Sequence, residues 1–197
     1  MQQSTKKRLI SHALKLFSNK GYDGVGVQQI VDAGKVSKPT LYHHFQNKKG
    51  LLNALLEEEL TPLLVSLEQL AFTTDFEQDL VRCGLVISDY AKAHSDLYRL
   101  FLCLMFAPPE SPQFEVAVAY GKRQFSAVEN VFLHHHHEKN KNSEDAIALY
   151  AANFQGLLHN LITLYLHGHI QLDTNLVTRS VHMFVYGMYA VEPFNIC

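Results

Sequence analysis

The segment SKPTLYHHFQNKK, residues 37–49, predicts a short helix that begins just after Ser37. Serine is a favourable N-cap residue, and Pro39 is tolerated in the first helical turn, where the backbone N–H groups have no internal acceptor. The predicted helix has about two turns, well below the ~12–15 residues at which isolated helices become marginally stable in water. It therefore needs neighbouring elements to hold it in place.

One side of this short helix is apolar and the other is polar. Leu41 and Phe45 are four residues apart and point in the same direction. Pro39, Thr40, Tyr42 and His43 fan across the opposite side, and the next helix is expected to start at Lys48 after an Asn47 cap. Two buried residues thus anchor the helix and leave a polar face exposed.

Two further helices are expected before this segment. Residues 5–20 carry a repeating apolar face and end at Gly21, a residue favoured after a helix C-terminus. A second helix is predicted over residues 27–33, followed by a turn at residues 34–36. A helix, a tight turn and a second short helix have the organisation of a DNA-binding helix-turn-helix.

The charge distribution supports a nucleic-acid partner. Residues 1–50 contain nine Lys and Arg residues against two acidic residues, a net charge of +7, whereas the rest of the chain carries −9. A basic module on an acidic body fits a phosphate backbone, and a merely solvated basic face is the alternative.

The rest of the chain predicts an all-α fold. Helical periodicity continues throughout, and 47% hydrophobic residues are ample for a buried core. A kink or break is expected at Pro62, and Thr74 with Glu77 is expected to form a capping box for the following helix. Two long apolar helices, over about residues 144–168 and 174–190, indicate a subunit interface; the alternative is a purely internal bundle.

Residues 8–24, RLISHALKLFSNKGYDG, and residues 27–52, VQQIVDAGKVSKPTLYHHFQNKKGLL, resemble the tetracycline-repressor (TetR) family of bacterial transcriptional regulators. The resemblance implies a DNA-binding domain over residues 1–50 and a helical effector-binding and dimerisation domain over residues 51–197. It also implies a cytoplasmic homodimer that represses transcription from a palindromic operator and is released by a small-molecule effector.

The resemblance also implies which residues bind DNA. The operator-facing surface would consist of Ser37, Lys38, Pro39, Thr40, Tyr42 and His43. Phosphate contacts would come from Tyr42, His44 and Lys48, and Gln28 would lie near the groove edge. The helical geometry agrees for Thr40 and Tyr42 but places His44 nearer the buried side.

The chain departs from the family pattern at two turns. Gly34-Lys35 replaces the usual Ala-Gly, which puts a lysine where glycine would accept a positive φ; we expect the turn to be reset by one residue. Gly26 replaces the threonine that commonly caps the second helix, and it offers no hydroxyl to a phosphate.

The effector site is predicted from a polar stripe in the helix over residues 144–168 and from aromatic residues elsewhere. The candidate ligand-binding residues are Tyr90, Phe101, Met105, Arg123, Phe125, Asn153 and Asn160. They favour an apolar or aromatic effector, although the stripe is equally consistent with a solvent-facing or interface position. The candidate dimer-interface residues are Phe154, Leu158, Leu161, Tyr165, Val181, Phe184, Val185 and Met188.

Other functions have less support. The run of histidines at residues 134–137 raises the alternative of a metal-responsive regulator, but consecutive helical residues cannot all face one ion, so a solvated helix end is favoured. A helical dimer that acts only through protein contacts is a third alternative. No catalytic motif or cofactor loop occurs, so we expect no enzyme activity, no metal and no cofactor. Polar residues interrupt the longest apolar stretch, so no membrane span is expected.

Overall fold

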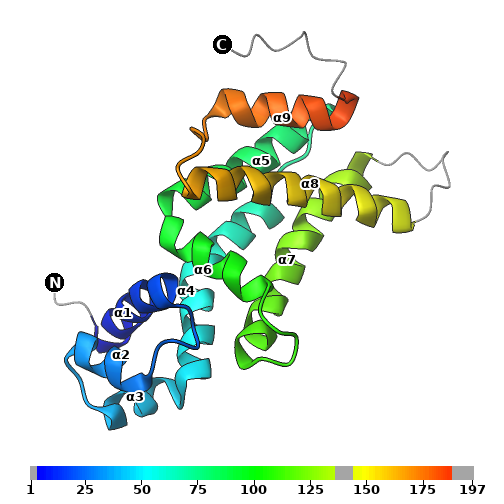
Figure 1. Cartoon of the computed structure of the whole chain (residues 1–197). Helices are drawn as coiled ribbons and strands as arrows, with labels where there is room; N and C mark the ends of the chain where they lie inside the picture. Colours follow the sequence, from blue (N-terminus) through cyan, green and yellow to red (C-terminus); the bar gives the residue numbers. More distant parts are fainter. Residues whose placement is uncertain (1–3, 136–143, 188–197) are drawn as a thin grey trace. The chain divides into compact units, whose positions relative to one another are not determined.

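The computed structural model describes residues 4–135 and 144–187, and α-helices account for all regular structure in these ranges (Figure 1). The prediction of an all-α fold is confirmed. The helices are α1 (Thr5–Lys20), α2 (Val27–Gly34), α3 (Lys38–Phe45), α4 (Lys48–Glu68), α5 (Phe76–Ala93), α6 (Ser95–Met105), α7 (Pro112–His135), α8 (Glu144–Leu166) and α9 (Thr174–Tyr186).

The chain forms two compact units that are described separately. Unit 1 contains residues 1–62 and 94–122, and unit 2 contains residues 63–93 and 123–197. Helices α4 and α7 therefore each contribute residues to both units. The predicted functional boundary at residue 50 concerns DNA and effector binding rather than packing, and it stays a prediction.

Unit 1 is built around the first three helices. Helix α1 packs against α2 and α6, and α2 packs against α3. The buried side chains of these three helices are Leu9, Ile10, Ala13, Phe17, Ile30, Val31, Leu41 and Phe45. Full burial of one such large apolar side chain contributes about 1.5–3 kcal/mol, which compensates for the low intrinsic stability of the short helices.

Helix α4 continues through Pro62, so of the expected kink or break the break is wrong and the kink stays a prediction. Proline removes one backbone donor and disfavours helical geometry at the preceding residue. Leu60, Leu63 and Leu64 are nevertheless fully buried on either side of it. Packing of these leucines keeps the adjoining turns helical, and the two compact units divide at this point, between Pro62 and Leu63.

The N-cap of helix α5 lies one residue later than expected, at Asp75 rather than Thr74. The Oδ1 atom of Asp75 accepts the Gln78 N–H at 3.0 Å, so Asp75 caps the helix and the predicted Thr74–Glu77 capping box is wrong. Aspartate is as good an N-cap as threonine, and its neighbour Thr73 is held by other contacts.

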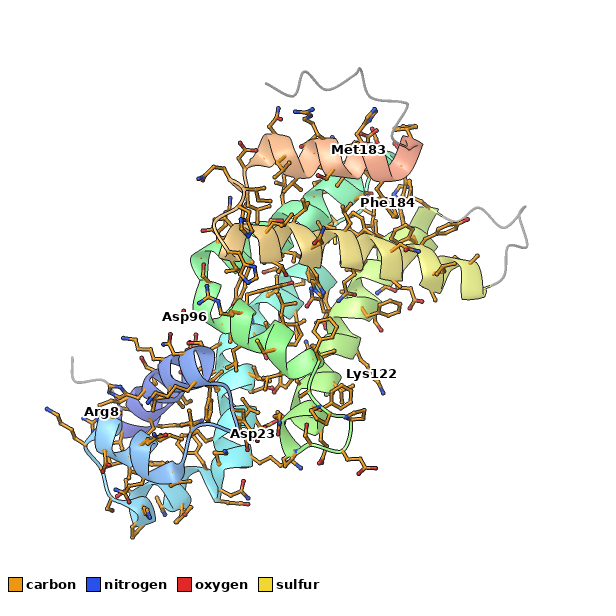
Figure 2. All side chains as sticks on the ribbon, viewed as in Figure 1. Arg8, Asp23, Asp96, Lys122, Met183 and Phe184 are labelled. Carbon is orange, nitrogen blue, oxygen red and sulfur yellow. The ribbon has the colours of Figure 1, made fainter. Side chains whose placement is uncertain are left out.

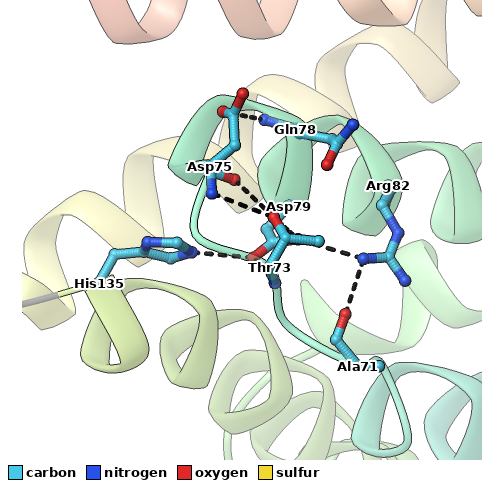
Figure 3. Close-up of polar contacts among 7 residues, drawn as sticks. All are labelled: Ala71, Thr73, Asp75, Gln78, Asp79, Arg82 and His135. Carbon is cyan, nitrogen blue, oxygen red and sulfur yellow. Dashed lines mark hydrogen bonds and ion pairs between the residues drawn. The ribbon is translucent and has the colours of Figure 1, made fainter.

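Those contacts surround the buried carboxylate of Asp79 (Figure 3). Its oxygens accept the Thr73 N–H at 2.8 Å and the Thr73 hydroxyl at 3.1 Å, and they lie 3.2 Å from Arg82 Nη1 and 2.9 Å from His135 Nε2. Burial acts to raise the pKa of Asp79, but the hydrogen bonds from His135 and Thr73 outweigh it and hold the pKa below its ordinary value.

This network corrects part of the expectation for the histidine run. His135 is half-buried against Asp79, and His134 stacks on Phe72 with ring centroids 4.7 Å apart, so these two residues form more than a solvated helix end. His136 and His137 lie outside the described residues.

Unit 2 brings α5, α8 and α9 together at Gly84. A Cβ atom at this position would lie 3.2 Å from Val177 Cγ1 and 3.3 Å from Leu158 Cδ2, so the glycine permits a close approach of the three helices. Phe184 lies on the side of α9 that faces α8, with its ring 5.4 Å from that of Phe154 (Figure 2).

Over residues 4–135 and 144–187, no helix is both long and apolar enough to cross a membrane.

Candidate nucleic-acid interface

Helix α3 has a buried side and an exposed side. Leu41 is fully buried and Phe45 is 5% exposed, whereas Tyr42 is 45% exposed. The other exposed candidates on or just before the helix are Ser37, Lys38, Pro39, His43 and His44. The expectation that His44 lies nearer the buried side is therefore wrong. The polar groups form one outward face on a helix that two apolar residues hold in place.

The first turn of α3 is capped as the sequence predicts. Ser37 Oγ accepts the Thr40 N–H at 3.3 Å and lies 2.8 Å from the Thr40 hydroxyl. Thr40 is half-buried, so it presents less surface than its neighbours. The start of the helix thus carries two hydroxyl groups beside N–H groups that have no internal acceptor, an arrangement that can accept a phosphate.

The turn between α2 and α3 places its positive φ on Lys35, at φ 50° and ψ 49°. The residue in the left-handed region is thus the lysine itself, and the expected reset by one residue is wrong. A Cβ atom at Gly34 would lie 2.9 Å from Leu9 Cδ2, so a larger residue there would require the Leu9 side chain to shift. Close packing of α2 on α1 favours the glycine, and the lysine adopts the strained conformation.

The junction between α3 and α4 is equally tight. Gln46 has φ 65° and ψ −46°, and Asn47 N–H donates to the Phe45 carbonyl at 2.7 Å, which forms a γ-turn. The Asn47 side chain accepts the Gly50 N–H at 2.8 Å, so the predicted cap is confirmed. A Cβ atom at Gly50 would collide with the Phe45 carbonyl. This junction sets the end of α3 relative to α4.

Lys48, a predicted phosphate contact, is engaged within unit 1. Its Nζ donates to the carbonyls of Tyr22 and Val25, each at 3.0 Å, and lies 4.1 Å from the centre of the Tyr22 ring. Burial lowers the pKa of Lys48 below its ordinary value, although the charge of Asp23 acts in the opposite direction. The sequence does not reveal this role, because the carbonyls that it binds lie more than twenty residues away along the chain.

The side chains of α2 show how this helix starts. Gly26 offers no hydroxyl, as expected, and its N–H donates to Gln29 Oε1 at 3.1 Å. Exposed Gln28 donates to Asp32 Oδ1 at 2.7 Å along the same helix. Any contact between Gln28 and a groove edge requires this bond to open or to be shared.

The candidate effector-binding residues are divided between the two units. Phe101 is buried and Met105 is half-buried in unit 1, whereas Tyr90, Arg123, Phe125, Asn153 and Asn160 belong to unit 2. Arg123 donates from two nitrogens to the Glu68 carboxylate, both at 2.9 Å, and Asn153 donates to the Leu149 carbonyl at 2.8 Å. This candidate set stays a prediction.

Half of the candidate dimer-interface residues are already buried within one chain. They are Phe154, Leu158, Leu161 and Val181. Because they have almost no surface left to offer within one chain, these four would support the predicted interface helices from inside, and the interface set stays a prediction. Tyr165, Phe184 and Val185 are half-buried, and Met188 lies outside the described residues.

Helices α8 and α9 also carry exposed apolar residues that helical periodicity alone does not single out. Leu149 is 60% exposed, Tyr150 is 51% exposed and Tyr186 is 57% exposed. Their exposure is visible only once the faces buried against α5 are known. Among the described residues, no group of three or more His, Cys, Asp and Glu side chains is arranged to hold a metal ion.

Comparison with known proteins shows which family the N-terminal part of the chain resembles. Residues 9–55, which contain α1, α2, α3 and the start of α4, match the model of the bacterial regulatory proteins of the tetR family. The chain is 35% identical over 94 residues to the HTH-type transcriptional activator FasR of Mycolicibacterium smegmatis. The aligned residues make up 47% of this chain and 43% of FasR. It is 32% identical over 111 residues to the class E tetracycline repressor protein of Escherichia coli, and the aligned residues make up 56% of this chain and 51% of the repressor.

The chain thus spans about half the length of the curated relatives that it matches. Its fold resembles that of the transcriptional regulator FadR from Bacillus subtilis in complex with stearoyl-CoA, with a TM-score of 0.76 and 15% sequence identity. The superposition covers 92% of this chain and 98% of the FadR chain. Members of this family are transcription regulators and not enzymes. The matched helices are those that carry the exposed face of α3, and over residues 9–55 the chain is similar to the tetR family of bacterial regulatory proteins.

Proposed function

We propose that this protein is a cytoplasmic, homodimeric transcription regulator that binds a palindromic DNA operator through α3 and represses transcription until a small molecule releases it. The exposed polar face of α3, held by buried Leu41 and Phe45 inside a segment of net charge +7, carries the proposal. The groove-facing residues would be Ser37, Lys38, Pro39, Thr40, Tyr42 and His43, with Gln28, His44 and Lys48 at the edge.

The chemistry of these side chains indicates which would bind phosphates and which would recognise bases. Lysine ammonium groups and the N–H groups at the start of α3 attract phosphates without regard to sequence. Hydroxyl groups, imidazoles and the Tyr42 phenol carry donors and acceptors that match base edges in the major groove. Lys48, with two of its three donors already used, would assist mainly by fixing α4 beside the DNA-reading helix.

A dimer would present two copies of α3 to two half-sites. Exposed Leu149, Tyr150 and Tyr186 on α8 and α9 support an interface formed by these two helices. The half-sites would lie about one turn of DNA apart, or a multiple of it. The direction of regulation is proposed from the class E tetracycline repressor protein, whereas FasR is named as an activator.

Release by an effector requires only a modest difference in affinity between two arrangements of the protein. Such couplings are typically ~1–3 kcal/mol. The candidate residues Tyr90, Phe101, Met105, Arg123, Phe125, Asn153 and Asn160 would bind an apolar or aromatic effector, as FadR is seen to bind stearoyl-CoA.

Selection of bound sequences from a pool of random DNA duplexes tests the proposal. We expect enrichment of a palindrome, and binding that weakens with salt with a log–log slope of about −0.9 per neutralised phosphate. Replacing Lys38 by Gln should reduce the slope by about one, whereas Lys122→Gln, which removes another exposed charge, on α7, should leave it unchanged.

Each failure has a distinct meaning. No enriched sequence at low salt, without any added small molecule, contradicts DNA binding itself. An enriched but asymmetric sequence contradicts the dimer. Activation of a promoter that carries the selected site, in transcription with purified polymerase, contradicts the repressor assignment. A change in operator binding on zinc titration supports the metal-responsive alternative.

A further inference from the structure

The loop between α1 and α2, residues 21–26, is held in place by α4. Tyr22 and Val25 are buried, and their carbonyls accept the two hydrogen bonds from the Lys48 ammonium group. Within the loop, the Val25 N–H donates to the Tyr22 carbonyl at 3.3 Å. Because the loop leads directly into α2, and α2 packs against α3, the position of the loop affects where the exposed face of α3 lies.

Asp23, in the same loop, is held from α7 (Figure 2). Gln113 Nε2 donates to Asp23 Oδ2 at 2.8 Å, across 90 residues of sequence, and Gln113 is only 5% exposed. Burial lowers the pKa of Lys48 and the charge of Asp23 opposes that effect, so Asp23 helps to keep the ammonium group charged. A hydrogen bond to a charged partner stabilises more than one between neutral groups. Gln113 therefore fixes the carboxylate that supports Lys48.

The first turns of α7 also contact one face of α4. Lys49, Asn53 and Glu57 are spaced four residues apart and therefore share a face of that helix. Tyr120, which is 6% exposed, donates from its hydroxyl to Glu57 Oε2 at 3.0 Å and lies 3.4 Å from the Asn53 carbonyl oxygen. Glu115 lies 2.7 Å from Lys49, but both side chains are largely exposed, so this ion pair contributes little. The hydrogen bond from buried Tyr120 is the main polar link between α7 and α4 at this face.

We propose that Gln113 and Tyr120 are positioning residues for DNA recognition, and that the start of α7 belongs functionally to the DNA-reading module. Gln113 holds the loop before α2, and Tyr120 holds α4. The tight turn at Gln46 and Asn47 sets α4 against α3. Helix α3 is thus braced through both of its neighbours in sequence by a single helix. The inference rests on the proposed DNA-binding function, and it extends the DNA-reading module beyond the predicted boundary at residue 50.

The test measures a specificity ratio, the Kd for a non-specific duplex divided by the Kd for the selected operator, with the full chain and no effector. Gln113→Met keeps the length and the charge of the side chain but removes the donor. We expect the ratio to fall about fivefold or more, because the arrangement that reads bases becomes a smaller fraction of the population. Non-specific binding depends on phosphate charge and should stay unchanged. Tyr120→Phe, which removes only the hydroxyl group, should lower the ratio in the same way.

Gln124→Met is the matched control for a purely structural effect. Gln124 is fully buried in the same helix but belongs to unit 2. Its replacement should lower the free energy of unfolding and leave the specificity ratio unchanged. A double-mutant cycle with Asp23→Ala then assigns the effect to the contact itself. Gln113→Met should lower the ratio in the parent and have no further effect in the Asp23→Ala background, whereas full additivity of the two changes contradicts the assignment.

Amide hydrogen exchange gives a second readout that needs no DNA. Gln113→Met should speed exchange of the Val25 amide about tenfold more than that of Ile87, a buried residue of unit 2, as expected for loss of a hydrogen bond to a charged group. A parent protein that selects no operator contradicts the proposed function, and the inference falls with it. Where the parent does select an operator, an unchanged ratio or an unchanged Val25 exchange rate in Gln113→Met overturns the inference alone. If that variant does not fold, an unchanged ratio in Tyr120→Phe overturns it.

Discussion

Lys35 carries the backbone strain of the turn before α3. A non-glycine residue in the left-handed region costs about 1–2 kcal/mol, because its Cβ approaches the following carbonyl oxygen. Glycine avoids this cost but loses about 0.5–1 kcal/mol more conformational entropy on folding. Lys35→Gly should therefore raise the free energy of unfolding by up to about 1 kcal/mol, measured by urea denaturation.

The control for this prediction removes the same charge at a helical position. Lys38→Gly, in the first turn of α3, should lower the free energy of unfolding by up to about 1 kcal/mol. Equal changes in the two variants would show that charge, and not backbone conformation, governs both.

Gly50 is constrained by space at the junction of α3 and α4. Its added Cβ would collide with the Phe45 carbonyl, which is backbone and can move only if the γ-turn at Gln46 changes. Gly50→Ala should therefore lower the free energy of unfolding by about 1–3 kcal/mol. Gly156→Ala, in an α8 position with no atom within 4 Å of the new Cβ, should raise it by about 0.5–1 kcal/mol. Stabilisation of both variants in thermal unfolding would contradict the crowding at Gly50.

At the level of elements, the Asp79 network makes the stability of the protein depend on pH. The pKa of Asp79 in the folded state lies below its ordinary value of 3.8, so the unfolded chain takes up the proton first as the pH falls. The stabilisation from the ionised carboxylate is complete above the ordinary pKa and is lost as the pH falls through the folded pKa. Asp79→Asn should lower stability at neutral pH and flatten the acid side of the stability curve.

The matched control for Asp79 is an exposed aspartate. Asp89 lies 2.8 Å from Lys92 and its side chain is 62% exposed, so Asp89→Asn should change stability by less than about 1 kcal/mol. The measurement is the free energy of unfolding by urea over a series of acidic buffers. An acid limb that is as steep in Asp79→Asn as in the parent would contradict the role of this carboxylate.

Elements whose signals are local could be predicted from the sequence. Ser37, Pro39, Leu41 and Phe45 define α3 because a cap, a permitted proline and a pair of residues four apart act within two turns of helix. The continuation of α4 through Pro62 could not be predicted in this way, because distant packing of neighbouring leucines outweighs the local effect of proline.

The candidate nucleic-acid interface could likewise be predicted where it depends on local sequence, but not where it depends on distant contacts. The exposed face of α3 follows from helical periodicity, whereas the engagement of Lys48 with Tyr22 and Val25 depends on how the loop after α1 folds back. Likewise, Phe154 and Leu158 look suitable for a subunit contact by hydrophobicity alone. Only the position of α5 shows that they are internal and that Leu149 and Tyr150 are exposed.

At the scale of the whole molecule, the proposed dimer should depend on the exposed apolar residues of α8. A glutamate introduced at Leu149 would have to be buried without a partner in the interface, whereas it would remain in water on the monomer. Leu149→Glu should raise the dimer dissociation constant at least about 100-fold, which corresponds to about 2.7 kcal/mol, and leave the helical content unchanged. Operator affinity should fall with it, because one α3 alone reads only a half-site.

Phe106→Glu is the matched control for this prediction, since Phe106 is 84% exposed and belongs to unit 1, outside α8 and α9. It should leave both the dimer and operator affinity as they are. Sedimentation equilibrium measures the dissociation constant, and circular dichroism checks the helical content of each variant. A Leu149→Glu protein that stays dimeric at the concentrations where the parent does would exclude α8 from the interface. Dissociation caused only by Phe106→Glu would instead place the subunit contact on unit 1, and the two DNA-reading helices would then have to be paired by that unit.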